Sequence, residues 1–132
     1  MANTSRAVVW IGRALSALTV LGLGFSAVMK FQRPPEVVDF FVNKFGYPEA
    51  ALFVIGVLEA GCAILYAIPQ TAVLGGILVA AYLGGAVATH VRMSHPLLSH
   101  TLFPIYVAVF VWAGLVLRDA RLRILLPVGR VS

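Results

Sequence analysis

The chain has 132 residues, of which 61% are hydrophobic and 11% are charged, and its formal net charge at pH 7 is +5. A soluble domain of this size buries only about two thirds of the surface that its unfolded chain exposes, so this composition excludes an ordinary soluble fold. The single cysteine, Cys62, excludes an intrachain disulfide and any site built on several thiols.

Four long apolar segments dominate the chain. A transmembrane helix needs about 20 predominantly apolar residues, so four such segments and short connectors account for nearly the whole length. We therefore predict an all-α, integral membrane four-helix bundle that forms a single domain over residues 1–132. The predicted spans are residues 7–29, 48–68, 71–90 and 101–117.

The first apolar segment follows a basic residue, as the core of a signal peptide does. From Ala14 to Met29 it contains no helix breaker, it ends in Lys30, and no small-residue cleavage signature follows. We expect it to be retained as the first span, with removal as the alternative.

Between the first two spans, residues 35–45 have the pattern of a short amphipathic helix that lies in the membrane interface. Pro35 can occupy the first position of this helix, and Gly46 can end it. One face carries apolar side chains and the opposite face mostly polar ones: Val37, Val38, Phe41, Val42 and Phe45 against Glu36, Asp39, Asn43 and Lys44.

The second and third spans are separated only by Pro69 and Gln70, which predicts a tight antiparallel hairpin. In the third span, small residues recur at every fourth position: Gly76, Ala80, Gly84 and Ala88. Such a stripe lets a neighbouring helix approach closely. The neighbour is either another helix of the same bundle or a second copy of the chain.

Basic residues are divided unequally between the two faces of a four-span protein. One face holds both termini and six arginines: Arg6, Arg13, Arg118, Arg121, Arg123 and Arg130. The other face holds four basic residues: Lys30, Arg33, Lys44 and Arg92. The positive-inside rule then predicts cytoplasmic termini, in the inner (plasma) membrane of a bacterium. Basic residues at span ends face phospholipid headgroups, so membrane lipids and not nucleic acid are the expected partners.

Glu59 lies near the middle of the second predicted span, where an unpaired charge is costly. Arg13 lies inside the first span, and a salt bridge between the two would lower the cost of burying each. The alternative is that Glu59 stays wholly or partly protonated because burial disfavours its charged form. It could then hydrogen-bond a ligand such as a quinone or exchange protons with it.

Three histidines, His90, His95 and His100, occur around the end of the third span, near Lys30 and Arg92. Their spacing of five residues does not align ligands on one helix turn, so neither a metal nor haem is expected. Lys30, His90 and Arg92 could instead line a pocket for an anionic or quinone headgroup. Contact with lipid headgroups is the alternative.

Several short motifs follow one another in a particular order and spacing. They are Met29-Lys30-Phe31, Phe45-Gly46-Tyr47-Pro48, Ile55-Gly56-Val57-Leu58-Glu59, Ile68-Pro69 and Gly85-Ala86-Val87-Ala88-Thr89-His90. In these features the sequence resembles the DoxX-like family of small bacterial four-span membrane proteins, over nearly the whole chain. The chain departs from that pattern where a glycine often precedes the basic residue of the first span, since Ser26 or Ala27 stands there.

The resemblance implies that Lys30, Glu59 and His90 are recurring polar sites. Because the family is named after a subunit linked to thiosulfate oxidation with quinone as acceptor, it also implies an accessory or redox-linked, quinone-associated subunit of a membrane complex. A stand-alone membrane enzyme acting on a lipophilic substrate, a non-catalytic scaffold and a homo-oligomer remain open. We take Glu59 and His90 as candidate catalytic residues. The candidate ligand-binding residues are Lys30, Arg92, His95, His100 and Arg13.

Overall fold

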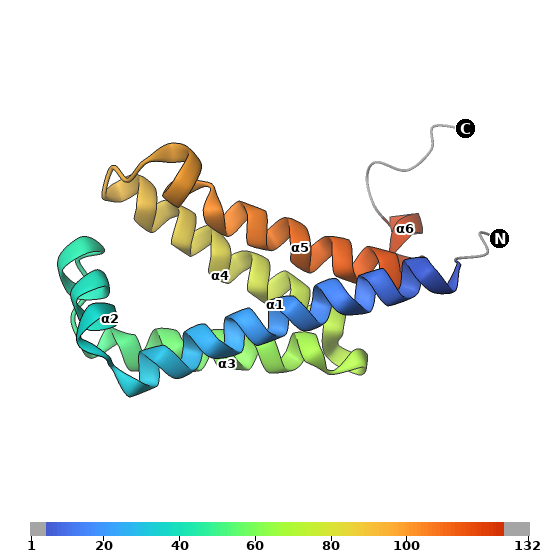
Figure 1. Cartoon of the computed structure of the whole chain (residues 1–132), viewed down its shortest axis with the longest axis horizontal. Helices are drawn as coiled ribbons and strands as arrows, with labels where there is room; N and C mark the ends of the chain where they lie inside the picture. The colour runs from blue at the N-terminus through green and yellow to red at the C-terminus, as the bar shows by residue number, and fades with distance from the viewer. Residues whose placement is uncertain (1–4, 126–132) are drawn as a thin grey trace.

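The computed structural model describes residues 5–125, and that part of the chain is helical with no strand. Four helices form the bundle (Figure 1). They are α1 (Arg6–Gln32), α3 (Ala51–Ala67), α4 (Ala72–Arg92) and α5 (Phe103–Arg118). Their ends fall within three residues of the predicted span ends.

Shorter helical segments connect these four. They are α2 (Pro35–Asp39), the π-helix η1 (Phe40–Lys44), the 3-10 turn η2 (Pro69–Thr71), the π-helix η3 (Leu97–Thr101) and α6 (Ala120–Leu125). Together α2 and η1 occupy the predicted amphipathic helix. Its apolar side chains are half-buried or buried, and its polar ones are exposed. Gly46 ends this segment with a φ of 75°, a left-handed conformation that glycine adopts without strain.

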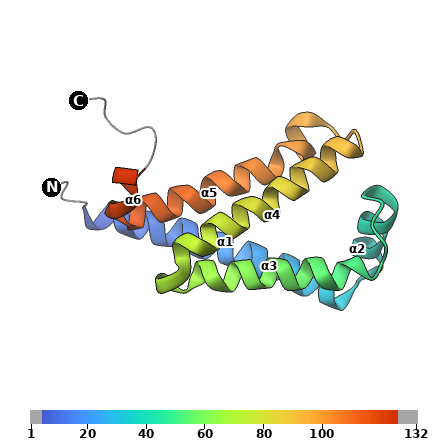
Figure 2. The same cartoon turned by 180° about the vertical axis from the view of Figure 1, so that it is seen from behind.

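The four long helices form a ring in which each packs against two neighbours. Helix α1 packs on α3 and α5, and α4 packs on the same two helices from the other side (Figures 1 and 2). Toward the end that carries α2 and η3, the α4–α5 pair draws apart from the α1–α3 pair (Figure 1). The bundle is therefore tight at one end and open at the other.

At the tight end, Tyr66 of α3 is completely buried and joins three helices. Its hydroxyl donates to the carbonyl oxygen of Val111 in α5 at 2.7 Å and lies 2.9 Å from the Ser16 hydroxyl in α1. Helix α4 approaches the same residue through Gly75, where an added Cβ would lie 2.2 Å from the Tyr66 backbone nitrogen. Tyr66 is thus a buried packing residue and not the interfacial anchor that a tyrosine near a span end usually is.

The predicted small-residue stripe packs inside the bundle only in part. Gly76 faces α5, where an added Cβ would lie 2.6 Å from Leu115 Cδ1. Gly84 has no heavy atom within 4 Å of such a Cβ, and Ala88 is exposed. The closest helix approach uses Gly75, which lies outside the stripe.

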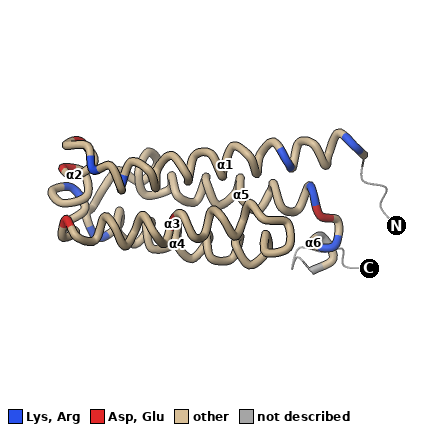
Figure 3. The backbone as a smooth tube through the Cα atoms, turned by 90° about the horizontal axis from the view of Figure 1, so that it is seen from below, with Lys and Arg blue, Asp and Glu red and all other residues tan. Residues whose placement is uncertain are grey.

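The bundle has an apolar exterior and polar groups inside, the reverse of a soluble protein. Leu18, Leu21 and Phe25 are each more than 65% exposed, whereas Lys30 and Glu59 are almost fully buried. Charged residues are concentrated at the two ends of the bundle, and few occur in its middle (Figure 3). These features identify a small helical membrane protein.

Within residues 5–125, three helical segments are long and apolar enough to cross a membrane, namely Arg6–Gln32, Pro69–Arg92 and Leu97–Arg118. The fourth, α3, is apolar but has only 17 residues, or about 25 Å at 1.5 Å per residue. That length is at the lower limit for a span.

The predicted orientation depends on the number of basic residues that face headgroups on each side of the membrane. For two of these residues, the structure does not show such a position. Lys30 is buried in the bundle, so it does not face lipid headgroups as predicted. Arg130 lies outside the described residues. The membrane orientation stays a prediction.

Candidate functional site

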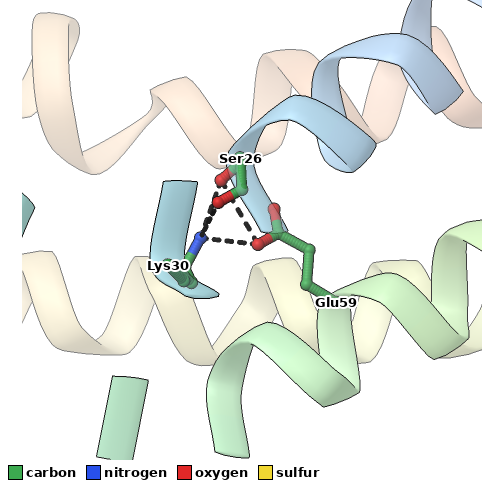
Figure 4. Close-up of polar contacts among 3 residues, drawn as sticks. All are labelled: Ser26, Lys30 and Glu59. Carbon is green, nitrogen blue, oxygen red and sulfur yellow. Dashed lines mark hydrogen bonds and ion pairs between the residues drawn. The ribbon is translucent and has the colours of Figure 1, made fainter. Parts of the chain in front are cut away.

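An ion pair between α1 and α3 lies at the base of the open end of the bundle. The Lys30 ammonium is 2.5 Å from Oε2 of Glu59 (Figure 4), and the two side chains are only 5% and 4% exposed. The Phe41 ring from η1 covers the ammonium, with the ring centroid 5.2 Å from Nζ. Each charge offsets the burial cost of the other, which permits a carboxylate at mid-helix.

Ser26, one helical turn before Lys30, connects the two charges. Its hydroxyl accepts a hydrogen bond from Lys30 Nζ at 2.7 Å and donates one to Glu59 Oε2 at 3.2 Å (Figure 4). Ser26 stands where the resemblance led us to expect glycine, and its role was not predicted from the sequence. The i, i+4 spacing between Ser26 and Lys30 could have predicted that their side chains meet, because residues four apart are neighbours on a helix surface.

The predicted Arg13–Glu59 salt bridge is wrong, because Glu59 pairs with Lys30 instead. Arg13 precedes Ser26 by about 20 Å along the α1 axis at 1.5 Å per residue. There its guanidinium stacks on Trp10, with 5.0 Å to the ring centroid, and it lines a separate surface pocket with Tyr66 and Arg118.

A cavity of about 500 Å³ lies above the ion pair, between the separating helix pairs. Its walls are mostly apolar and come from α1, η1, α4 and α5, with Glu59 contributed by α3. Besides Thr19, the polar side chains that line it are Ser26, Lys30, Glu59, Tyr82 and His90, and the part of the cavity that these five line is called its inner end. Pockets for small organic ligands have this size and this mixture of apolar walls and few polar groups.

The cavity opens sideways, where the bundle faces lipid. Its rim includes Leu18 on α1 and Phe103 and Phe110 on α5, which are 67%, 59% and 53% exposed. Along α1 the lining extends from Leu15 to Lys30, or about 22 Å at 1.5 Å per residue. A molecule with a polar head and an apolar tail could therefore reach the ion pair from the membrane.

The three histidines lie together although their spacing did not suggest it. Helix α4 ends at Arg92, Ser94 turns the chain with a φ of 56°, and η3 returns beside α4. Nδ1 of His90 is 2.8 Å from Nδ1 of His95, and the His100 ring centroid is 6.0 Å from that of His90. Only His90 lines the cavity. Among the described residues, no group of three His, Cys, Asp or Glu side chains is placed to hold a metal ion.

Arg92 lies outside the cavity, in contrast to the predicted pocket of Lys30, His90 and Arg92. Its guanidinium donates to the carbonyl oxygen of Phe45 at 2.5 Å and stacks on the Tyr47 ring, because α4 ends beside the loop that follows η1. The Phe45 ring in turn packs edge-on against His90, with 4.9 Å between centroids. Arg92 thus fixes the loop that covers the histidine.

One comparison with known proteins found a match. The model of the DoxX-like family matches residues 14–114, which include Lys30, Glu59 and His90. No curated protein and no solved structure matches the chain. Since the match covers more than half of the sequence, the chain belongs to the DoxX-like family.

Proposed function

We propose that this membrane protein binds a lipophilic molecule with a polar head, of the quinone class, as a redox-linked accessory subunit of a membrane complex. The observation that carries the proposal is the buried Lys30–Glu59 pair at the inner end of a cavity that opens toward lipid. A buried ion pair is rarely needed for stability alone, since well-packed apolar residues often serve as well.

The residues around the cavity fit such a head. The Glu59 carboxylate and the His90 ring belong to the inner end, where they could hold or exchange a proton with a bound molecule. The apolar rim would receive the tail. When bound, a quinone would supply the capacity to carry electrons and protons between partners.

The test is to purify the protein in mild detergent, extract the bound lipids and identify them by mass spectrometry. We expect a quinone to copurify with the wild type and to be depleted in Glu59→Gln, with a matching loss of quinone reduction in membranes. Glu49→Gln is the matched control, because the Glu49 side chain is 58% exposed. No bound quinone, together with unchanged quinone reduction in Glu59→Gln, would reject the proposal.

A non-catalytic scaffold is the second candidate, favoured by the half of the small-residue stripe that faces outward. Gly84 and Ala88 leave a flat outer face on α4 that a partner helix could approach. Migration of the native protein in mild detergent distinguishes the candidates. A protein that runs alone at monomer mass would count against the scaffold, and a Gly84→Leu variant that leaves the complex would support it.

A further inference from the structure

The hydrogen bonds that the polar groups at the inner end already make restrict which polar head of a ligand can bind there. Lys30 has three N–H donors, and three acceptors surround them: Glu59 Oε2 at 2.5 Å, the Ser26 hydroxyl at 2.7 Å and the Ser26 carbonyl at 3.5 Å. The ammonium is therefore occupied as a donor, and Glu59 neutralises its charge. An anionic head would find no free cation among the described Lys and Arg residues that line this cavity.

The Glu59 carboxylate, in contrast, has acceptor capacity that Lys30 and Ser26 do not use. The hydrogen bonds from Lys30 and from Ser26 both go to Oε2 (Figure 4). Glu59 is only 3% exposed and lines the cavity, where the Tyr82 hydroxyl also lies within reach of its carboxylate. A carboxylate oxygen can accept more than one hydrogen bond, so the carboxylate keeps acceptor capacity for a ligand that supplies a donor.

Tyr82 supplies the complementary group. Tyr82 lines the same cavity, and its hydroxyl lies close enough to hydrogen-bond the Glu59 carboxylate and is hydrogen-bonded to no other described residue. His90 engages His95 through Nδ1, which leaves Nε2 free. The inner end thus offers one strong acceptor beside groups that can donate.

We propose that the cavity selects a neutral amphiphile whose ring carries a hydroxyl group, which donates a hydrogen bond to the Glu59 carboxylate and accepts one from Tyr82. This inference rests on the proposed function, and it narrows the ligand to the hydroxylated, reduced form of the head. A carbonyl or ether oxygen cannot donate to Glu59, and a carboxylate would lie against another carboxylate.

The main comparison varies the head of the probe on the wild-type protein, so misfolding of a variant cannot produce a difference between the probes. Three probes share one ring and tail: 4-dodecylphenol, 4-dodecylanisole and 4-dodecylbenzoate. Binding to the purified full chain is measured by native mass spectrometry at several concentrations. Gly22→Phe serves as the blocked control, because Gly22 lines the cavity and has open space at its Cβ position.

The phenol is expected to bind about 10- to 100-fold more tightly than the ether and the carboxylate, the range for one hydrogen bond to a charged acceptor. Equal binding of phenol and ether would overturn the donor assignment and leave the proposed function standing. If the benzoate bound most tightly, the donor assignment would be overturned, and the cavity would instead select an anionic head. If no probe binds better to the wild type than to Gly22→Phe, the inference and the proposed cavity function both fail.

Discussion

Lys30 on α1 and Glu59 on α3 are joined by a 2.5 Å ion pair that is almost fully withdrawn from solvent. Among the described residues that line the cavity, no other Lys, Arg, Asp or Glu is present. The two charges therefore depend on each other, and on Ser26, for their stabilisation.

Removing one partner should cost much more than removing both. Lys30→Met leaves Glu59 as an uncompensated buried charge, and we expect a loss of about 3–5 kcal/mol in the free energy of unfolding. The double variant Lys30→Met/Glu59→Leu should regain most of that loss, because apolar residues can replace a buried pair. Thermal unfolding in detergent measures both. A double variant less stable than Lys30→Met would show that the pair itself supplies net stability.

The exposed pair of Arg33 and Glu49 is the control for this comparison. Its atoms are 4.0 Å apart and its side chains are 42% and 58% exposed. Glu49→Gln should change the free energy of unfolding by no more than about 1 kcal/mol.

The Ser26 hydroxyl should contribute through its two charged partners. We expect Ser26→Ala to lower the free energy of unfolding by about 1.5–3 kcal/mol, the range for hydrogen bonds to charged groups. Ser99→Ala, which removes an exposed hydroxyl bonded only to His100, should stay within about 0.5 kcal/mol. Equal effects of the two substitutions would argue against the bridging role of Ser26.

Two glycines of α4 should respond in opposite ways to the same substitution. In Gly75→Ala, the new Cβ would lie 2.2 Å from the Tyr66 backbone nitrogen, so the α3–α4 packing must shift and stability should fall by about 1–3 kcal/mol or more. In Gly84→Ala, the Cβ meets nothing within 4 Å, and the higher helix propensity of alanine should leave stability unchanged or slightly raised. The thermal melting midpoints of the two variants measure the difference. A larger loss of stability in Gly84→Ala than in Gly75→Ala would contradict this packing.

The predicted orientation can be tested by labelling single cysteines in a Cys62→Ala background. Ser94→Cys lies between α4 and η3, and Ser5→Cys lies at the opposite end, before α1. A membrane-impermeant maleimide should label Ser94→Cys in intact cells and Ser5→Cys only after permeabilisation. The reverse pattern would place the termini outside.

Helix positions could be predicted from sequence because length, hydropathy and proline placement act locally. Pro35 begins α2, and Gly46 ends the amphipathic segment as predicted. Burial along this segment also follows the predicted apolar and polar faces, since the pattern of side chains decides which face is covered.

The partner of Glu59 could not be predicted, because it depends on how two helices of unequal length align. Helix α1 has 27 residues and α3 has 17. The segment that contains α2 and η1 joins the last residue of α1 to the first residue of α3. The middle of α3 therefore meets the last part of α1, where Ser26 and Lys30 lie, and not the part near Arg13. The histidine cluster was missed for a related reason, since it forms only when η3 folds back on α4.

The most direct test of the account is the distance between the Lys30 ammonium and the Glu59 carboxylate in a lipid bilayer. Lys44 is the second lysine of the chain, and Glu36 and Glu49 are its other glutamates, so Lys44→Arg/Glu36→Gln/Glu49→Gln leaves one of each. With ¹⁵N-lysine and ¹³C-carboxyl glutamate, solid-state NMR should show strong dipolar dephasing between the two nuclei. Dephasing no greater than in a sample without the ¹³C label would contradict the buried pair and the cavity function built on it.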